Sequence, residues 1–343
     1  MLQRNNHYVP CLYLKRFADA QQSVFVYRTL VSDFREPAWR KKPVGSIAYQ
    51  RHLYVRSASG IESDDIEKWL NAEIETPAEE AFAKATSDAR LYPSDWHNLI
   101  RFLAAQQLRT PASLSENLKR WNEMVPAVLD NTLQRSVRHL EATKNSGEAI
   151  RIQKAPNSEY IPLRVKTEIG EGEDFGLVRA EVVVGRGLWF FALRHALTST
   201  VKALIEHRWT ILVAPDDRTW FTTDDPVVPL NYYADGTYDF KGGWGSRGTE
   251  IFMPLSPHHL LYTKIGERPP VRGSVVRRAV ADMMRRFTAE HAHRLIIAAS
   301  IDDTIAKFRP RTVNAELVRS EREQWHRWHE IQTTAERELM NSR

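Results

Sequence analysis

The spacing of hydrophobic residues changes twice along the chain. Near the N-terminus, Val24–Arg28 and His52–Arg56 are short runs rich in β-branched and aromatic residues, which predict two β-strands joined by a basic connector. Between residues 62 and 142 the apolar residues recur at helical spacing. Helices are predicted to begin where a capping residue or a proline precedes each apolar series, at Ser63, Thr76, Ser94 and Thr110.

The second half of the chain returns to strands after a polar interruption. Residues 144–172 are polar and contain prolines and glycines, which predicts an irregular insertion. Helices are expected at 188–207, near 276–287 and, with Trp325 and Trp328 on one side, at 315–339. The remaining apolar runs predict short strands at 209–213, 219–222, 250–253 and 259–264, with a glycine-rich hairpin loop at 236–248.

These elements predict one α+β domain spanning residues 1–343. A two-stranded hairpin is marginal in water, and the next strands after the N-terminal pair begin only near residue 209. We therefore expect a mixed, mostly antiparallel sheet that draws strands from both ends of the chain, with the helical middle segment packed on it.

Composition places the chain among globular proteins. It has 343 residues, of which 42% are hydrophobic and ten are tryptophan, enough for a large core. No apolar run approaches the ~20 residues of a membrane span, and the first residues lack the apolar core of a signal peptide. Cys11 is the single cysteine, which excludes an internal disulfide and fits a reducing compartment. We expect a cytoplasmic protein that does not bind membranes.

The charge is mildly basic and unevenly distributed. Forty-eight lysines and arginines stand against 43 acidic residues, and the cations concentrate at 35–56 and 264–294. Such clusters either contact the phosphates of a nucleic acid or nucleotide, or lie in solvent without a ligand. Arg278 and Arg285 are seven residues apart on one predicted helix, off its apolar stripe. We expect both guanidinium groups to reach solvent and to contact nucleic acid if it is the partner.

Several polar positions suit acid–base or metal chemistry. His7 is either a structural hydrogen-bonding residue or a general base or metal ligand. Asp224 and Asp225 precede a proline in an extended segment, so at most one of them faces any given pocket. Asp224 is expected to form a turn, ligate a divalent ion or orient a histidine. His291 and His293 would bind a metal well from a strand, but the helical pattern there points their rings apart.

One further pair of polar residues lies at the margin of an apolar helix stripe. Gln106 and Arg109 are three residues apart and share a helix face. Near the core they need partners, which are Asp224, another protein group or a ligand phosphate. We expect one pocket, in which Asp224 pairs with His7 or Arg109. Its expected members are His7, Tyr8, Gln106, Arg109, Asp224 and Ser256.

The opening segment resembles that of a known bacterial family. His7-Tyr8-Val9-Pro10, followed by Tyr13-Leu14-Lys15-Arg16-Phe17, is similar to the HHYVPQFYLRRF opening of the "domain of unknown function 4238" family. Later segments agree in the same order: Gln106 with Arg109-Thr110-Pro111, Phe221–Val227 and Phe252–Pro257. Asn6, Cys11 and Thr223 depart from the family pattern. The resemblance implies a single domain over most of the chain, and it implies no activity.

Two classes of function are consistent with these residues. The first is a hydrolase acting on a phosphodiester or nucleotide, for example a nuclease-like effector of bacterial defence. Its base would be His7, its phosphate clamp Arg109 and its orienting carboxylate or divalent-metal ligand Asp224. Substrate contacts would come from Gln106, Tyr8, Ser256, Arg278 and Arg285. The second class is a non-catalytic binding protein, in which the polar residues form a structural network and the C-terminal helix docks on a partner protein.

Overall fold

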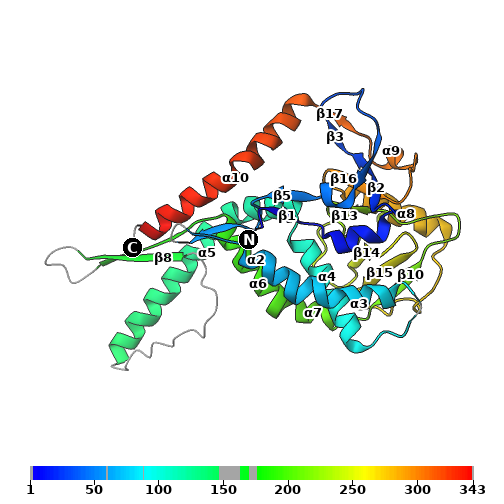
Figure 1. Cartoon of the computed structure of the whole chain (residues 1–343). Coiled ribbons are helices and arrows are strands. Elements are labelled where there is room, and N and C mark those ends of the chain that lie inside the picture. The colour runs from blue at the N-terminus through cyan, green and yellow to red at the C-terminus, as the bar shows by residue number, and fades with distance from the viewer. Residues whose placement is uncertain (1–2, 59–60, 88, 147–162, 170–175, 342–343) are drawn as a thin grey trace.

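The computed structural model describes residues 3–341 except 59–60, 88, 147–162 and 170–175. It confirms the α+β fold: two antiparallel sheets pack with a layer of helices, and both sheets lie in one half of the molecule (Figure 1). The main hydrophobic core joins residues from Tyr8 to Trp328, so segments from both ends of the chain share it. None of the helices in the described residues has the length and apolar character needed to cross a bilayer.

The first sheet draws on both ends of the chain, as predicted. Its strand order is β11 (Thr222–Thr223), β16 (Leu295–Ala298), β2 (Ser23–Arg28) and β4 (Trp39–Pro43), and every neighbouring pair is antiparallel. Val26 is paired with Arg40 on one side and Ile297 on the other. Since alternate residues share a face, one face carries Val26, Arg28, Arg40, Lys42 and Leu295. The other face packs Tyr27 and Ile296 into a small separate core.

The second sheet is formed by the later strands alone. Its order is β10 (Thr210–Val213), β15 (His259–Lys264), β14 (Glu250–Pro254), β12 (Val228–Tyr232) and β13 (Tyr238–Asp239), again antiparallel. Alternation along β14 sends Ile251 and Met253 into the main core, whereas Phe252 packs on the opposite side with Met284 and Phe287 of α8 (Arg278–His291). The sheet is therefore covered on both faces.

The helical middle segment packs on this core largely as predicted. Its elements are α2 (Asp65–Leu70), η3 (Asn71–Glu75), α3 (Thr76–Ala85), α4 (Pro93–Leu108), α6 (Arg186–His195), η4 (Ala196–Thr200) and α7 (Val201–Ile205). Two predicted starts differ from the structure. Thr76 continues from the π-helical turn η3, and α4 is capped at Tyr92, whose backbone N–H donates to Asp95, so Ser94 lies inside the helix.

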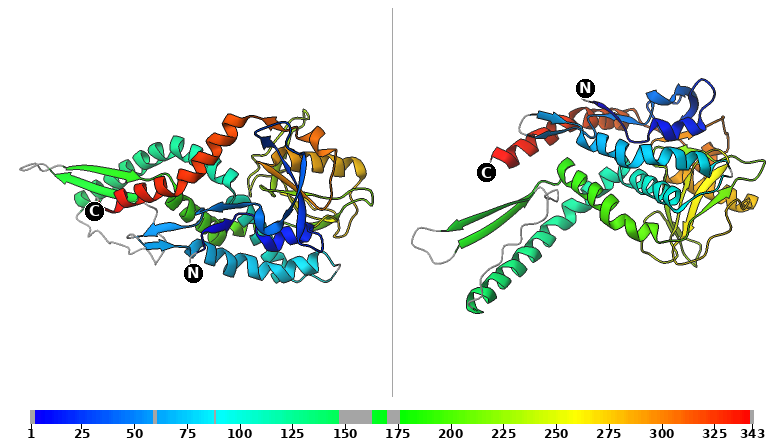
Figure 2. Two further views of the ribbon diagram at one scale, coloured as in Figure 1. Left: turned by 45° about the horizontal axis from the view of Figure 1, so that its top comes forward. Right: turned by 60° about the horizontal axis from the view of Figure 1, so that its bottom comes forward.

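A long helix and a hairpin extend away from the rest of the molecule. α5 (Pro111–Ser146) is longer than predicted, and β8 (Leu163–Ile169) pairs with β9 (Gly176–Val182) (Figure 2). The expectation of an irregular segment at 144–172 is thus wrong for β8, where apolar and polar residues alternate at the strand period. The other part of that segment, 147–162 and 170–172, lies outside the described residues.

The predicted strand His52–Arg56 is not formed. β1 (Asn5–His7) pairs instead with β5 (Tyr49–Arg51), and His52 turns the chain with a positive φ of 58°. The apolar residues Leu53–Val55 are completely buried, but they do not pair in a sheet. The shorter elements around them are α1 (Cys11–Leu14), η1 (Lys15–Phe17), η2 (Val44–Ser46), the β6 (Arg56–Ala58)–β7 (Ile61–Ser63) pair, α9 (Ile305–Phe308) and the parallel pair β3 (Leu30–Val31)–β17 (Thr312–Val313).

The C-terminal helix α10 (Ala315–Asn341) packs on its own chain (Figure 1). Trp328 is buried in the main core and Trp325 packs against it. Beyond them, the fully buried Arg186 binds Glu336 through two nitrogens and donates to the Val55 carbonyl. The helix expected to dock on a partner protein is therefore held by the body of this molecule, with Trp328 buried and Trp325 partly buried.

Candidate active site

A cavity of about 790 Å³ lies between the first sheet and α10. The open face of β2 and β4 forms one wall, β5 forms a second, and one side of α10 closes it from above (Figure 1). Its volume is in the range typical of small-molecule sites, about 300–1,000 Å³. The cavity joins residues that are distant in sequence, since β2 and α10 lie at opposite ends of the chain.

Three cations line the sheet wall of the cavity. Arg28, Arg40 and Lys42 share the open face because of the strand register, and all three are solvent-exposed. Arg40 has a 3.4 Å ion pair with Glu36. Within the described part of the chain, neither Arg28 nor Lys42 has a carboxylate within ion-pair distance. Asp224, Glu321 and Glu330 line other parts of the same cavity, and the exposed cations of the sheet wall favour an anionic ligand beside that wall.

Asp224 is buried beside this wall, and the backbone holds it in place. Its carboxylate accepts hydrogen bonds from the backbone N–H groups of His293, at 3.0 Å, and Arg294, at 2.8 Å. Burial raises the pKa of Asp224 to about 6, against the opposing effects of the nearby His293 imidazole and these hydrogen bonds. The carboxylate therefore still ionises below neutral pH and faces the cavity.

His293 is the second titratable group at this place. Burial lowers its pKa, and the charge of Asp224 acts in the opposite direction. The imidazole is therefore neutral at pH 7 and can accept a proton. Asp224 and His293 together are a candidate acid–base pair.

The adjacent Asp225 belongs to a separate buried pair. Its carboxyl group accepts from the Thr110 hydroxyl at 3.2 Å and lies 3.3 Å from Nε2 of His291. Burial raises the pKa of Asp225 to about 8 and lowers that of His291 to about 4. At neutral pH Asp225 is therefore mostly protonated and His291 uncharged, so the two groups do not form an ion pair. Asp225 is not among the residues that line the cavity.

The two aspartates and two histidines pair across neighbouring strands. β11 is antiparallel to β16, and the backbone N–H of Asp224 donates to the Leu295 carbonyl, so residues 224–225 lie opposite 291–295. α8 ends at His291, so His293 lies outside the helix and faces the cavity. The two rings serve different sites, as the sequence pattern indicated. The proximity of His293 to Asp224 was not predicted, because it depends on a pairing between segments about 70 residues apart.

Tyr8 connects the cavity with a second buried network. Its phenol lines the cavity, and burial followed by the negative charge of Asp224 raises its pKa well above the usual value. With the amide oxygen of Gln106 facing Arg109, that amide donates to the Tyr8 carbonyl at 3.3 Å and accepts from Arg109 Nε at 2.5 Å. Tyr8 and Gln106 are thus close to each other, as expected.

Arg109 does not reach the cavity. It is completely buried, and its guanidinium donates to Glu75 at 2.7 Å and to Gln106. His7 lies within the electrostatic reach of this pair, and its Nε2 is 3.3 Å from the Gly45 carbonyl. We expected Asp224 to pair with His7 or Arg109, but its carboxylate is bound by backbone N–H groups instead. Glu75 is the ion-pair partner of the buried Arg109, so the Arg109 guanidinium does not require a ligand phosphate.

Three other expected substrate contacts lie elsewhere. Ser256 borders a different pocket, where its hydroxyl is 2.9 Å from Nδ1 of His259. Arg278 is 66% exposed, as predicted, and pairs with Asp217. The prediction that Arg285 reaches solvent is wrong: it is 3% exposed and bonded to Asp302. α8 is covered by the second sheet on one side and by the segment around α9 on another, which a single apolar stripe does not reveal.

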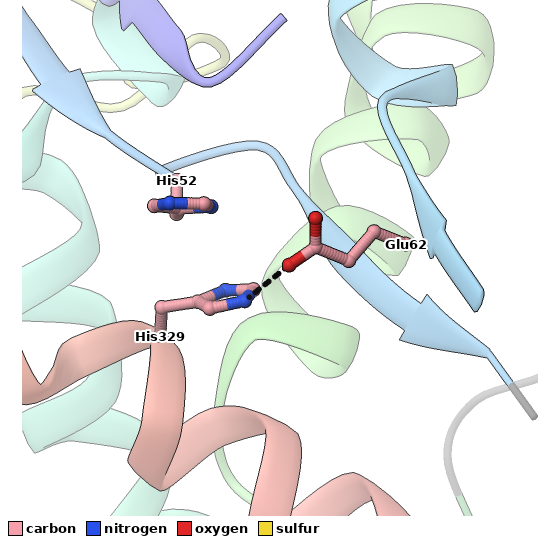
Figure 3. A group of neighbouring side chains, drawn as sticks. All are labelled: His52, Glu62 and His329. Carbon is pink, nitrogen blue, oxygen red and sulfur yellow. Dashed lines mark hydrogen bonds and ion pairs between the residues drawn. The ribbon is translucent and has the colours of Figure 1, made fainter. Parts of the chain in front are cut away.

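One group of potential metal ligands lies at the edge of the cavity: His52, Glu62 and His329 (Figure 3). The two imidazole rings are stacked, with centroids 4.2 Å apart and planes inclined by 25°. Their lone pairs lie in nearly parallel planes and do not converge on one ion. In addition, Nδ1 of His329 accepts from Arg186, so Nε2 carries the proton donated to Glu62 at 3.0 Å. The geometry fits a hydrogen-bond relay, not a metal centre.

The described residues offer no comparable ligand group around Asp224. Both oxygens of the Asp224 carboxylate accept hydrogen bonds from backbone N–H groups. An ion at this place would therefore have only the remaining lone pairs of this one carboxylate as protein ligands. The metal-ligand role of Asp224 stays a prediction.

The fold and the cavity define an α+β protein with a cavity partly lined by cations. The chain belongs to the family described as "Protein of unknown function (DUF4238)", whose model matches residues 5–302. No curated protein and no solved structure matches the chain. The matched range includes the sheet wall, Asp224 and His293, whereas α10, the remaining wall, lies beyond it.

Proposed function

We propose that this protein is a hydrolase acting on a phosphodiester or a nucleotide, with its active site in the cavity between the first sheet and α10. The observation that carries the proposal is the combination of exposed cations on the sheet wall with the buried Asp224–His293 pair in the same cavity. A phosphate hydrolase needs both: positive charge for the phosphate oxygens and a group that takes a proton from water.

Each group has a chemical role in this proposal. Arg28 and Lys42, which have no ion-pair partner among the described residues, bind the phosphate and stabilise the charge that develops in the transition state. His293, neutral at pH 7, accepts a proton from the attacking water. Asp224 stabilises the resulting imidazolium. These roles replace those expected for His7 and Arg109, since Arg109 is completely buried.

The test compares two adjacent aspartates. Purified protein is incubated with nucleoside triphosphates, with a chromogenic phosphodiester and with DNA and RNA, in Mg²⁺ or in chelator, and products are quantified. Asp224→Asn and His293→Gln are expected to lower kcat by about 10²–10⁴-fold. Asp225→Asn makes the same substitution one residue away, at a side chain that does not line the cavity, and should keep the activity. Full activity in Asp224→Asn, or no hydrolysis of any substrate by the wild type, would contradict the proposal.

A non-catalytic binding protein is the second candidate. It is favoured by the fully buried network of Arg109, Glu75 and Gln106, because these motif residues are engaged with one another. In that case the cavity binds its ligand without turnover, and Asp224→Asn leaves affinity unchanged. The same set of variants therefore separates the two candidates.

A further inference from the structure

The face of α10 that borders the cavity is long and partly aromatic. Residues along one side of the helix, from Val318 to Glu330, line the cavity. At 1.5 Å per residue this stretch is about 18 Å long. Trp325 lies in the middle of it, and Tyr49 of β5, which is 42% exposed, lines the same cavity. The cavity thus combines the cations of its sheet wall with one aromatic side chain on each of its other two sides, where Arg51 and Arg322 also line it.

α10 is fastened to the body at two places within this stretch and at one beyond it. Arg294 binds Glu321 through Nε, at 3.0 and 3.1 Å from its two oxygens, near the start of the helix. Further along, His329 binds Glu62, and Glu336 binds the buried Arg186. A groove for a nucleic-acid polymer has to be open at both ends, whereas ion pairs that hold α10 against the body restrict the length of ligand beside it.

We infer that the ligand of this cavity is a mononucleotide, with its phosphates on Arg28, Arg40 and Lys42 and its base stacked on Tyr49 and Trp325. The inference rests on the proposed function for the location of the phosphate site. Two features point to a nucleoside and to a ligand of limited length: Tyr49 and Trp325 line the same cavity as the cations, and α10 is held beside the cavity by ion pairs. An exposed tyrosine ring presents a flat π-surface to a base.

The experiment measures binding, so it does not depend on turnover. Calorimetric titration compares each of the four ribonucleoside triphosphates with inorganic tripolyphosphate and with a ten-nucleotide single strand. We expect at least one nucleoside triphosphate to bind at least tenfold more tightly than tripolyphosphate and than the oligonucleotide. Tyr49→Leu should weaken nucleotide binding about tenfold and leave tripolyphosphate binding unchanged. Lys42→Gln should weaken both.

Tyr232→Leu is the matched control, since Tyr232 is an exposed tyrosine on the second sheet, outside the cavity. Circular dichroism and thermal melting of each variant verify that it is folded. Equal affinity for tripolyphosphate and nucleotide, tighter binding of the oligonucleotide, or no binding of any nucleotide would overturn the inference. Nucleotide binding that depends on Tyr49, without hydrolysis, would support the inference and refute the proposed hydrolase activity. Hydrolysis of phosphate esters without a preference for a nucleoside would support the proposed hydrolase activity and overturn the inference.

Discussion

Replacement of Asp225 by asparagine tests the buried Asp225–His291 pair directly. The asparagine oxygen can accept from Thr110 as the carboxyl oxygen does, and the amide nitrogen takes the place of the oxygen that lies 3.3 Å from Nε2 of His291. The variant therefore reproduces the neutral form of Asp225 and removes its ionisation. Any difference in pH dependence between the two proteins then reports the titration of this one carboxyl group.

The magnitude follows from the raised pKa. An unfolded aspartate ionises near pH 3.8, whereas burial raises the pKa of Asp225 to about 8 in the folded protein. Because the folded-state pKa is the higher one, the stabilising contribution is complete below pH 3.8 and is lost as the pH rises toward 8. Within this window the loss is about 1.4 kcal/mol per pH unit. Between pH 5 and pH 8 the wild type should thus lose about 3–4 kcal/mol relative to Asp225→Asn.

Urea denaturation followed by tryptophan fluorescence at pH 5.0, 6.5 and 8.0 gives the required free energies of unfolding. We compare how the difference in the free energy of unfolding between the wild type and Asp225→Asn changes with pH. An effect of the amide that is the same at every pH therefore cancels. The titration of His291, whose pKa is lowered by burial, occurs in both proteins and cancels as well. Asp303→Asn, at an exposed aspartate, controls for the loss of one negative charge. A difference that does not vary between pH 5 and pH 8 would refute the reasoning, because Asp225 would then be ionised in the native state.

Two further predictions concern arginines that the structure buries. Arg285→Ala leaves Asp302 without its ion-pair partner and should lower the free energy of unfolding by about 3–5 kcal/mol, whereas Arg278→Ala on the exposed side of the same helix should change it by less than about 0.5 kcal/mol. An equal decrease in the free energy of unfolding for the two variants, measured by urea denaturation, would contradict the burial of Arg285 and the exposure of Arg278. Glu336→Gln weakens the contact with the buried Arg186 charge. Hydrogen exchange in the second half of α10 should accelerate, with the two sheets unchanged; unaltered exchange there would show that this contact does not fasten the helix.

Local patterns in the sequence were sufficient for the regular elements. β15 has the predicted boundaries and β2 differs by one residue, because residues in both alternate between two environments. His52–Arg56 has the same composition, but its apolar residues are buried by a turn with a positive φ at His52. A preference for extended conformation does not distinguish burial in a strand from burial in a turn.

The candidate site was less predictable, since it depends on contacts between distant segments. Asp224 and Tyr8 were recognised as candidates, and both line the cavity. The closeness of His293 to Asp224 was not recognised, because the two residues are brought together only by the pairing of β11 with β16. Arg109 was read as a phosphate ligand because a buried cation needs a partner. The sequence did not show that Glu75, 34 residues earlier, is that partner.

The two walls of the cavity are made at very different times during translation. β2 and β4 leave the ribosome early, and α10 follows about 290 residues later. At 5–20 residues per second this is a delay of about 15–60 s. During that time the cations of the sheet wall are not covered by α10, and the cavity is incomplete. A nascent chain that already contains both sheets is therefore still unable to hold the ligand. Any activity of the cavity begins only after the last helix has folded onto the body.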